Sequence, residues 1–157
     1  MTAPDPRARL EAREAELIRA LRRGQPPPGL DARMVAMASA GITRKRTRQL
    51  ARTCPALIRD LGPTYEERFA AFAQLNPPCD GGAIVDGLAF GSAIAAERAL
   101  SKAATIELML IHSSVRIRHG ELRSRPAPYV ALKWLRQPAA LIVVIRVPRL
   151  GLKVFST

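Results

Sequence analysis

The sequence has little of what secreted and membrane proteins need. Its two cysteines, Cys54 and Cys79, are too few for a disulfide framework and fit unpaired thiols in a reducing compartment. The longest unbroken apolar run, 139–145, is far shorter than the ~20 residues that span a bilayer. The first 25 residues alternate acids with arginines, where a secretory signal would show an apolar run. We therefore expect a cytoplasmic protein.

Catalytic and metal-binding signatures are also missing. The only histidines, His112 and His119, have no standard metal spacing and no carboxylate cluster nearby in sequence. Gly81-Gly82 follows a proline pair and precedes an expected helix, so it is no phosphate loop. No nucleophile elbow or Ser/His/Asp arrangement is suggested. We expect no catalytic residues, no metal site and no cofactor, and hence no enzyme.

Acidic residues are scarce in one part of the chain. The formal net charge is +12, and residues 113–157 carry nine bases against the single acid Glu121. Such a tail could attract nucleic acid, an anionic membrane, an acidic peptide or an acidic protein.

Hydrophobic residues make up 48% of the 157 residues, enough to bury a core, but aromatics only 4%, so that core must be mainly aliphatic. Helical periodicity and end signals predict six helices. Asp31 and Ser101 are expected N-caps, and Thr64 with Glu67 resembles a capping box. The expected ranges are 5–23, 31–53, 55–61, 64–75, 82–96 and 101–112.

The predicted buried positions of these helices are aliphatic and aromatic. Gly41 suggests a kink or a close crossing in the second helix. The first helix could pack on its own domain or on a partner. The expected core positions include Leu10, Leu17, Ile18, Leu21, Met34, Val35, Ala38, Ile42, Phe69, Phe72 and Leu75.

After Gly120 the pattern changes to alternation, which is typical of strands. Val130, Leu132 and Trp134 alternate with other residues, 141–147 is β-branched, and 152–154 ends the pattern. We expect an α+β protein: a bundle of five to six helices, then a small antiparallel β-meander, with 115–118 as a candidate fourth strand. The expected divisions are an amphipathic helix (1–23), a proline-rich connector (24–30), a helical domain (31–112) and a basic β-rich region (113–157).

The segment from Ile42 to Pro78 has the order of features of a known family. A basic helix is followed by a hydrophobic-Pro-Ala-hydrophobic turn, a Leu-Gly break, an aromatic-bearing helix and a proline pair. The matching residues are Arg44 to Arg52, Pro55-Ala56-Leu57, Leu61-Gly62, Phe69, Phe72 and Pro77-Pro78, with Pro27-Pro28-Gly29 as the connector. This order resembles the HvfC-type helical domain, once labelled DNA-binding, and its short actinobacterial relatives. The resemblance covers the chain from about residue 25 on.

That resemblance implies an accessory subunit. Such proteins accompany multinuclear non-haem iron oxidases that modify cysteine-containing ribosomal peptides, as in methanobactin biosynthesis. The iron ligands belong to the oxidase, while the partner helps bind the leader of the precursor peptide. A heterodimer with the oxidase is therefore the expected assembly.

The first hypothesis is peptide recognition by strand addition, in which an extended leader pairs with an open edge of the 129–155 sheet. Basic side chains would favour acidic leader residues. The candidate peptide-binding residues are Lys133, Trp134, Ile142, Val144, Arg146, Arg149 and Lys153.

The alternative is a nucleic-acid-binding protein, in which the basic helix and the basic tail neutralise phosphates. The same helix could instead bind the partner protein or be a solvated face. Its candidate residues are Arg44, Lys45, Arg46, Arg48 and Arg52. Few aromatics are available for base stacking, and no helix-turn-helix or zinc pattern is present. A membrane-surface role is disfavoured by the weak amphipathicity of the basic segments.

Overall fold

The computed structural model describes residues 5–23, 26, 29, 31–79, 81–118, 121–136, 139–147 and 151–156. These residues form six α-helices, one short 3-10 helix and five strands. The helices are α1 (Pro6–Arg23), α2 (Ala32–Thr53), α3 (Pro55–Leu61), η1 (Gly62–Thr64), α4 (Tyr65–Leu75), α5 (Gly82–Glu97) and α6 (Lys102–Ser114). The strands are β1 (Val115–Arg118), β2 (Glu121–Ser124), β3 (Tyr129–Arg136), β4 (Ala139–Val147) and β5 (Gly151–Ser156).

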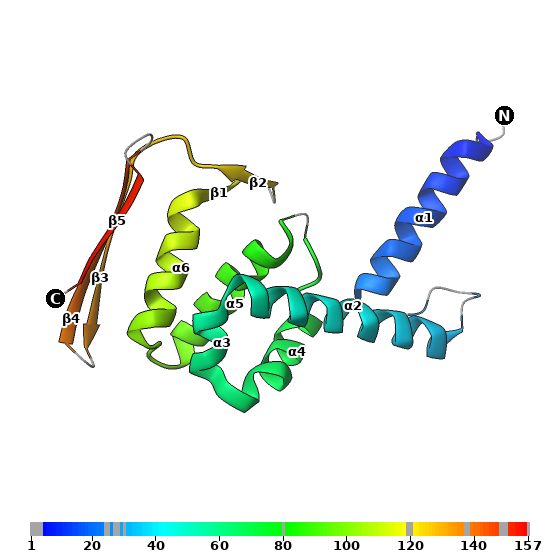
Figure 1. Cartoon of the computed structure of the whole chain (residues 1–157). Helices are drawn as coiled ribbons and strands as arrows, with labels where there is room; N and C mark the ends of the chain where they lie inside the picture. Colours follow the sequence, from blue (N-terminus) through cyan, green and yellow to red (C-terminus); the bar gives the residue numbers. More distant parts are fainter. Residues whose placement is uncertain are drawn as a thin grey trace.

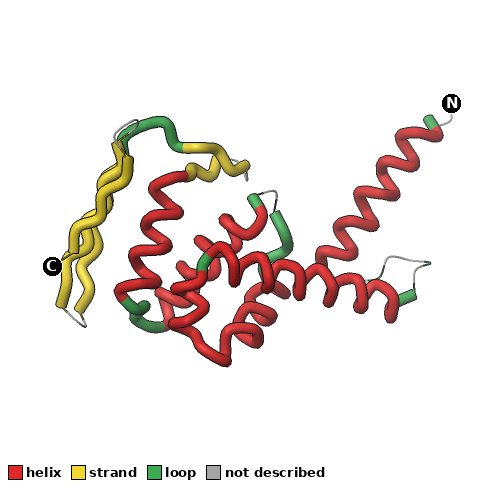
Figure 2. The backbone as a smooth tube through the Cα atoms, viewed as in Figure 1, coloured by secondary structure: helices red, strands yellow, loops and turns green. Residues whose placement is uncertain are grey.

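The predicted α+β class is confirmed. Helices α2 to α6 form the body, α1 projects from it at one end, and the sheet lies at the other end beside α6 (Figure 1). The sheet is an antiparallel meander in the order β3-β4-β5. The candidate fourth strand, β1, does not join it, because β1 pairs with β2 in a separate two-stranded ribbon. Figure 2 shows this ribbon directly after α6.

The helical core is centred on an aromatic cluster contributed by α4 and α5. Phe69 and Phe90 are fully buried, and their rings meet edge to face with centroids 5.3 Å apart. Phe72 and Tyr65 pack around them. Four of the chain's few aromatic residues therefore lie in one place, surrounded by aliphatic side chains of α2, α3 and α6.

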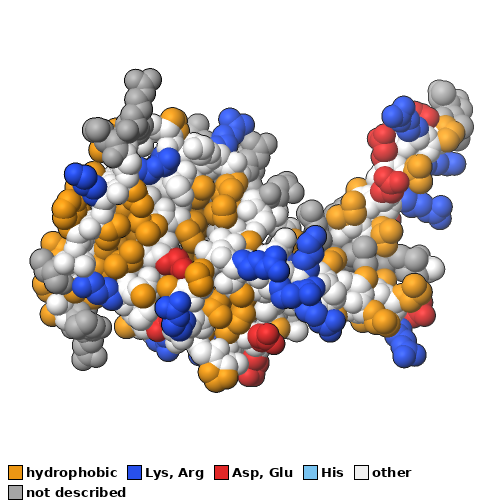
Figure 3. Space-filling model, viewed as in Figure 1, with side chains coloured by type: hydrophobic (Ala, Val, Ile, Leu, Met, Phe, Trp, Pro, Cys, Tyr) orange, Lys and Arg blue, Asp and Glu red, His pale blue; other side chains and the backbone are white. Residues whose placement is uncertain are grey.

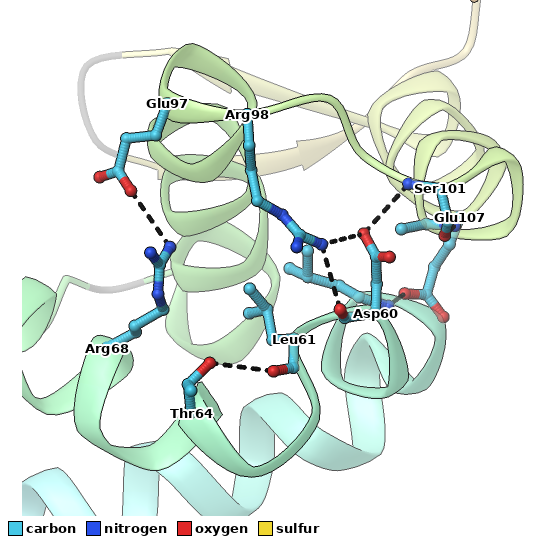
Figure 4. Close-up of polar contacts among 10 residues, drawn as sticks. Asp60, Leu61, Thr64, Arg68, Glu97, Arg98, Ser101 and Glu107 are labelled. Atoms are coloured by element: carbon cyan, nitrogen blue, oxygen red, sulfur yellow. Dashed lines mark hydrogen bonds and ion pairs between the residues drawn. The ribbon is translucent and has the colours of Figure 1, made fainter. Parts of the chain in front are cut away.

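Carboxylates tie α3 to the segments that follow α5 (Figure 4). Glu107 of α6 accepts hydrogen bonds from the backbone N–H groups of Ala56 and Leu57, both 2.9 Å long, at the start of α3. Asp60 accepts one from the Ser101 N–H and pairs with Arg98, each at 3.0 Å. A negative charge at a helix N-terminus is favourable, so Glu107 helps to hold α6 against α3.

Two of the three predicted helix caps are confirmed. Asp31 Oδ1 accepts from the Arg33 N–H at 2.8 Å, and Ser101 Oγ accepts from the Ala104 N–H at 3.2 Å. The predicted capping box at Thr64 is wrong. An N-cap needs extended backbone angles, but Thr64 stays helical (φ −79°, ψ −4°) because the chain continues from α3 through η1. Its hydroxyl donates instead to the Leu61 carbonyl.

Several predicted core positions are exposed. Met34 and Ala38 of α2 and Leu75 at the end of α4 face solvent, whereas Val35 is buried as predicted. The expected kink or close crossing at Gly41 is also wrong, because α2 continues through it. Apart from the adjoining residues and backbone of α2 itself, no described atom lies within 4 Å of the position that a Cβ would take there.

Helix α1 contacts α2 but buries little of its apolar stripe. Leu10, Leu17 and Ile18 are exposed, and among its described side chains only Ala20 is buried. Most of the predicted connector lies outside the described residues. No helix among the described residues is both long enough and apolar enough to cross a bilayer.

Candidate functional site

The sheet has two faces, and α6 covers only one of them. Leu135, Ala140, Ile142 and Val144 are buried against Ile106, Met109 and Leu110 of α6. Because side chains alternate along a strand and paired residues share a face, the register defines this inner face and an opposite outer face.

Ile142 and Val144 are therefore core residues. Both side chains are fully buried, and they lie on the central strand, whose two edges are occupied by β3 and β5. Neither the side chains nor the strand edge is accessible to a peptide. Ile142 and Val144 were predicted to contact the peptide, and this prediction is corrected: both belong to the core between the sheet and α6.

The basic candidates of the tail lie in different places. Arg146 is on the inner face, where Nη1 donates to the carbonyls of Ser113 (3.0 Å) and Arg125 (3.1 Å). It thus joins the sheet to the end of α6. Lys153 and Trp134 are exposed on the outer face, and Trp134, on the edge strand β3, also lines an open groove beside Lys133. Arg149 lies outside the described residues.

Lys133 lies on β3 beside this open groove. The groove, which we call the β3 groove, has a volume of about 590 Å³ and lies between α5, α6 and β3. Its lining includes Leu88 and Ala95 of α5 and Leu108 and Met109 of α6. Lys133 is exposed at its β3 side, so the groove combines an apolar floor with a cationic rim.

Gly91 allows the floor of the groove to form. A Cβ at this position would lie 2.5 Å from Leu108 Cδ1, closer than side-chain contacts permit. Glycine therefore lets α5 approach α6 closely.

One end of the groove is held by a cluster of ring and guanidinium groups. The Tyr129 hydroxyl lies 2.8 Å from His112 Nδ1, and the Arg125 guanidinium lies 4.7 Å from the centroid of the Tyr129 ring. His112 therefore serves as a packing and hydrogen-bonding partner of β3. These contacts fix the start of β3 relative to α6.

Four of the five basic candidates of α2 form an exposed cationic stripe. Arg44, Lys45, Arg48 and Arg52 are exposed, and Figure 3 shows Lys and Arg side chains gathered over α2. None of the four takes part in an ion pair found among the described residues. Arg44 and Arg48 also line a second open groove of about 710 Å³ between α2 and α4.

Arg46, which was named among the candidate nucleic-acid contacts, points the other way. It is buried and pairs with Asp86 of α5 through hydrogen bonds of 2.9 and 2.8 Å, and it also donates to the Asn76 carbonyl. A buried guanidinium is stable only when it is paired in this way. Arg46 is thus a structural residue and not a candidate contact for nucleic acid.

The side chains that could hold a metal ion are dispersed in the part of the chain that the structure describes. No three His, Cys, Asp or Glu side chains there gather as metal ligands would. Burial, with a smaller contribution from Glu107, raises the pKa of the Cys54 thiol to about 12. Burial, with Glu66 nearby, also raises the pKa of Tyr65. Both groups lie in the helical core and stay protonated near neutral pH.

A comparison with protein families decides where the helical part belongs. A family model described as "SCO6045-like, C-terminal domain" matches residues 11–96, more than half of the chain. The chain belongs to the SCO6045-like family. No curated protein and no solved structure matches it. In this SCO6045-like chain the match covers most of α1 and continues into α5, so it includes one wall of the β3 groove and ends before α6 and the sheet.

Sequence reasoning missed the α5 wall of this groove and the β1–β2 ribbon. Gly87 and Gly91, four residues apart, were an available signal of close helix packing on α5. Nothing in the sequence indicates that α5 lies beside the edge of β3, because these two elements come together only through their contacts with α6.

Proposed function

We propose that this SCO6045-like protein is a non-catalytic partner subunit of a multinuclear non-haem iron oxidase that modifies a cysteine-containing ribosomal peptide. In this role it would bind the oxidase and hold the leader of the precursor peptide. The single observation that carries the peptide-binding part is the open edge of β3, which lies beside the α5–α6 groove.

Strand addition fits β3 better than β5. In the described sheet each of these strands pairs only with β4, so each presents one free edge to an extended peptide. A strand added to β3 would lie over the groove, with α5 and α6 beneath it. A strand added to β5 would extend the exposed side of the sheet, since every described residue of β5 is exposed.

The groove supplies the side-chain recognition that backbone pairing lacks. Alternate residues of an added strand point to one side, and here that side is the apolar floor that includes Leu88, Leu108 and Met109. Lys133 at the rim would favour acidic residues of the leader. We therefore expect a leader segment that alternates apolar residues and carries an acid near Lys133.

The oxidase part of the proposal is supported by the family resemblance of residues 42–78. The exposed cations of α2 are the candidate docking surface, because they lie on the helical domain and away from the β3 groove. The oxidase would supply the iron and the oxidative chemistry. The residues of this chain would bind and orient.

The test is affinity capture of the tagged full-length protein from its native host. We expect an iron-containing oxidase and its precursor peptide to co-purify, identified by mass spectrometry and iron analysis. If no iron-containing oxidase is captured under conditions in which the host makes the peptide, the proposal is wrong.

A groove variant separates the two partners. Ala95→Trp places a large side chain at an exposed lining position of the groove and should lose the peptide while it retains the oxidase. Ala71→Trp, at an exposed position of α4 that lines neither groove, is the matched control and should retain both. Peptide binding by Ala95→Trp would exclude the β3 groove as the site.

Nucleic-acid binding is the second candidate, and one observation favours it. Arg44, Lys45, Arg48 and Arg52 form an exposed cationic stripe without ion pairs among the described residues. Phosphate neutralisation would make such binding fall steeply with salt. A titration with duplex DNA tests it, because absence of binding at low salt excludes this candidate.

A further inference from the structure

The outer face of the β3-β4-β5 sheet is a continuous apolar surface. The register places Leu132, Val143 and Phe155 in one row across the three strands. Val130 and Ile145 form the next row, and Trp134 and Leu141 the row on the other side. Because paired residues share a face, these seven side chains lie together on the side opposite α6.

This surface is uncovered. Val130, Leu132, Trp134 and Phe155 have 59%, 66%, 62% and 54% of their surface exposed. No described element lies on this side of the sheet (Figure 1). On proteins in aqueous solution, contiguous exposed apolar patches of several hundred Å² mark interaction surfaces.

The chemistry of the face limits what can cover it. Among the side chains that the structure describes on this face, Lys153 carries the only charge, and it lies on the edge strand β5. An acidic peptide or nucleic acid would meet only this one described cation here, at the edge of the face, in contrast to the four cations exposed on α2. The complementary surface must itself be flat and apolar, as this face is.

The available area matches the need of a dimer. Val130, Leu132, Trp134 and Phe155 are each more than half exposed, and two stacked copies would bury both sets in one interface. Stable interfaces begin at about 1,200 Å² in total, which a flat three-stranded face can approach. We propose that a second copy of this chain covers the outer face, with the two sheets stacked about a two-fold axis. Aligned sheets pack about 10 Å apart in this way, and a surface that pairs with itself suits a two-fold dimer.

This dimer uses a surface that is separate from the α2 stripe and that meets the β3 groove at the β3 edge, where Trp134 also lines the groove. The β3 groove opens on the inner side of the sheet, towards α5 and α6, and the α2 stripe lies on the helical body. Stacking through the outer face would leave the α2 stripe and the inner lining of the groove accessible.

Sedimentation velocity of the full-length protein between about 1 and 200 µM tests the proposal, because interfaces of this size have dissociation constants in or below that range. We expect a monomer–dimer equilibrium. Trp134 is the only tryptophan of the chain, so its fluorescence should shift to shorter wavelength as the dimer forms.

Paired variants identify the surface. Leu132→Glu places a charge in the centre of the face without touching the core and should weaken dimerisation by more than about tenfold, because a buried unpaired charge is costly. Leu75→Glu changes a leucine that is 84% exposed at the end of α4 and should dimerise like the wild type. A protein that stays monomeric over the whole range, that forms larger aggregates without a dimer plateau, or whose Leu132→Glu variant dimerises normally would overturn the proposal. The last result would point to pairing through the strand edges.

Discussion

Arg46 shows what the sequence could and could not reveal about a single residue. It follows Val35 and Ile42 and precedes Leu50 at intervals of seven, four and four residues, which places it on the buried stripe of α2. Helical periodicity therefore predicts that Arg46 lies on the buried side of α2, although the basic residues around it favour a position in solvent. The partner of Arg46, Asp86, could not be predicted from the sequence, because the two residues are 40 positions apart in the chain.

Two helical glycines should respond in opposite ways to alanine. Gly41→Ala should raise the free energy of unfolding by about 0.5–1 kcal/mol, because the new Cβ meets open space and alanine favours a helix. Gly91→Ala should lower it by about 1–3 kcal/mol, because its Cβ would overlap Leu108. Urea unfolding followed by far-UV circular dichroism measures both, and equal effects would show that α5 and α6 do not meet as described.

The buried thiol of Cys54 should make the protein sensitive to alkali. Burial raises its pKa from an ordinary value of 9.0 to about 12, so the folded protein keeps a proton that the unfolded chain releases. The stability due to this group is complete below pH 9 and is lost as pH rises towards 12. One such proton changes the free energy of unfolding by about 1.4 kcal/mol per pH unit.

Urea unfolding at several pH values above 9 measures this loss, to which Tyr65 also contributes because its pKa is raised. Cys54→Ala should reduce the pH dependence by about one proton. Cys79→Ala, at a partly exposed thiol, is the control and should behave like the wild type. An unchanged pH dependence in Cys54→Ala would contradict the assignment.

Among the elements, the helices and the order of the strands were predictable, but the buried face of the sheet was not. The alternation of Val130, Leu132 and Trp134 predicts an apolar face, yet that face is the exposed one. Strand β4 is apolar on both sides, so its sequence does not say which side meets α6. Only the contacts of Ile106, Met109 and Leu110 with the sheet decide this.

Neighbouring positions of β4 should therefore differ in their cost of truncation. Ile142→Ala removes a fully buried side chain and should destabilise the protein by about 2–5 kcal/mol. Val143→Ala, on the outer face, should cost less than about 1.5 kcal/mol in the monomer, because its side chain stays partly exposed. Thermal unfolding at low protein concentration compares the two, and a larger loss for Val143→Ala would reverse the assigned faces.

At the scale of the whole molecule, composition predicted a basic tail but not a single basic surface. Arg146 turns inward to the end of α6, Lys153 lies on the outer face, and Lys133 borders the groove. A strand sends successive side chains to opposite sides, so charges that are close in sequence are separated in space. The basic residues of the tail therefore lie in three different environments: the end of α6, the outer face of the sheet and the rim of the groove. A count of charges in the sequence could not show this separation.

Helix α6 is the one described helix that contributes to both hydrophobic cores, with Ala104, Leu108 and Ile111 in the helical core and Ile106, Met109 and Leu110 against the sheet. The smaller core beneath the sheet should therefore open without global unfolding, as a separate cooperative unit. In native-state hydrogen exchange we expect the amides of β5 to exchange first, those of β4 later, and those around Phe69 and Phe90 only with global unfolding. Equal protection of β4 and the helical core would mean that α6 transmits the opening of the sheet to the whole molecule.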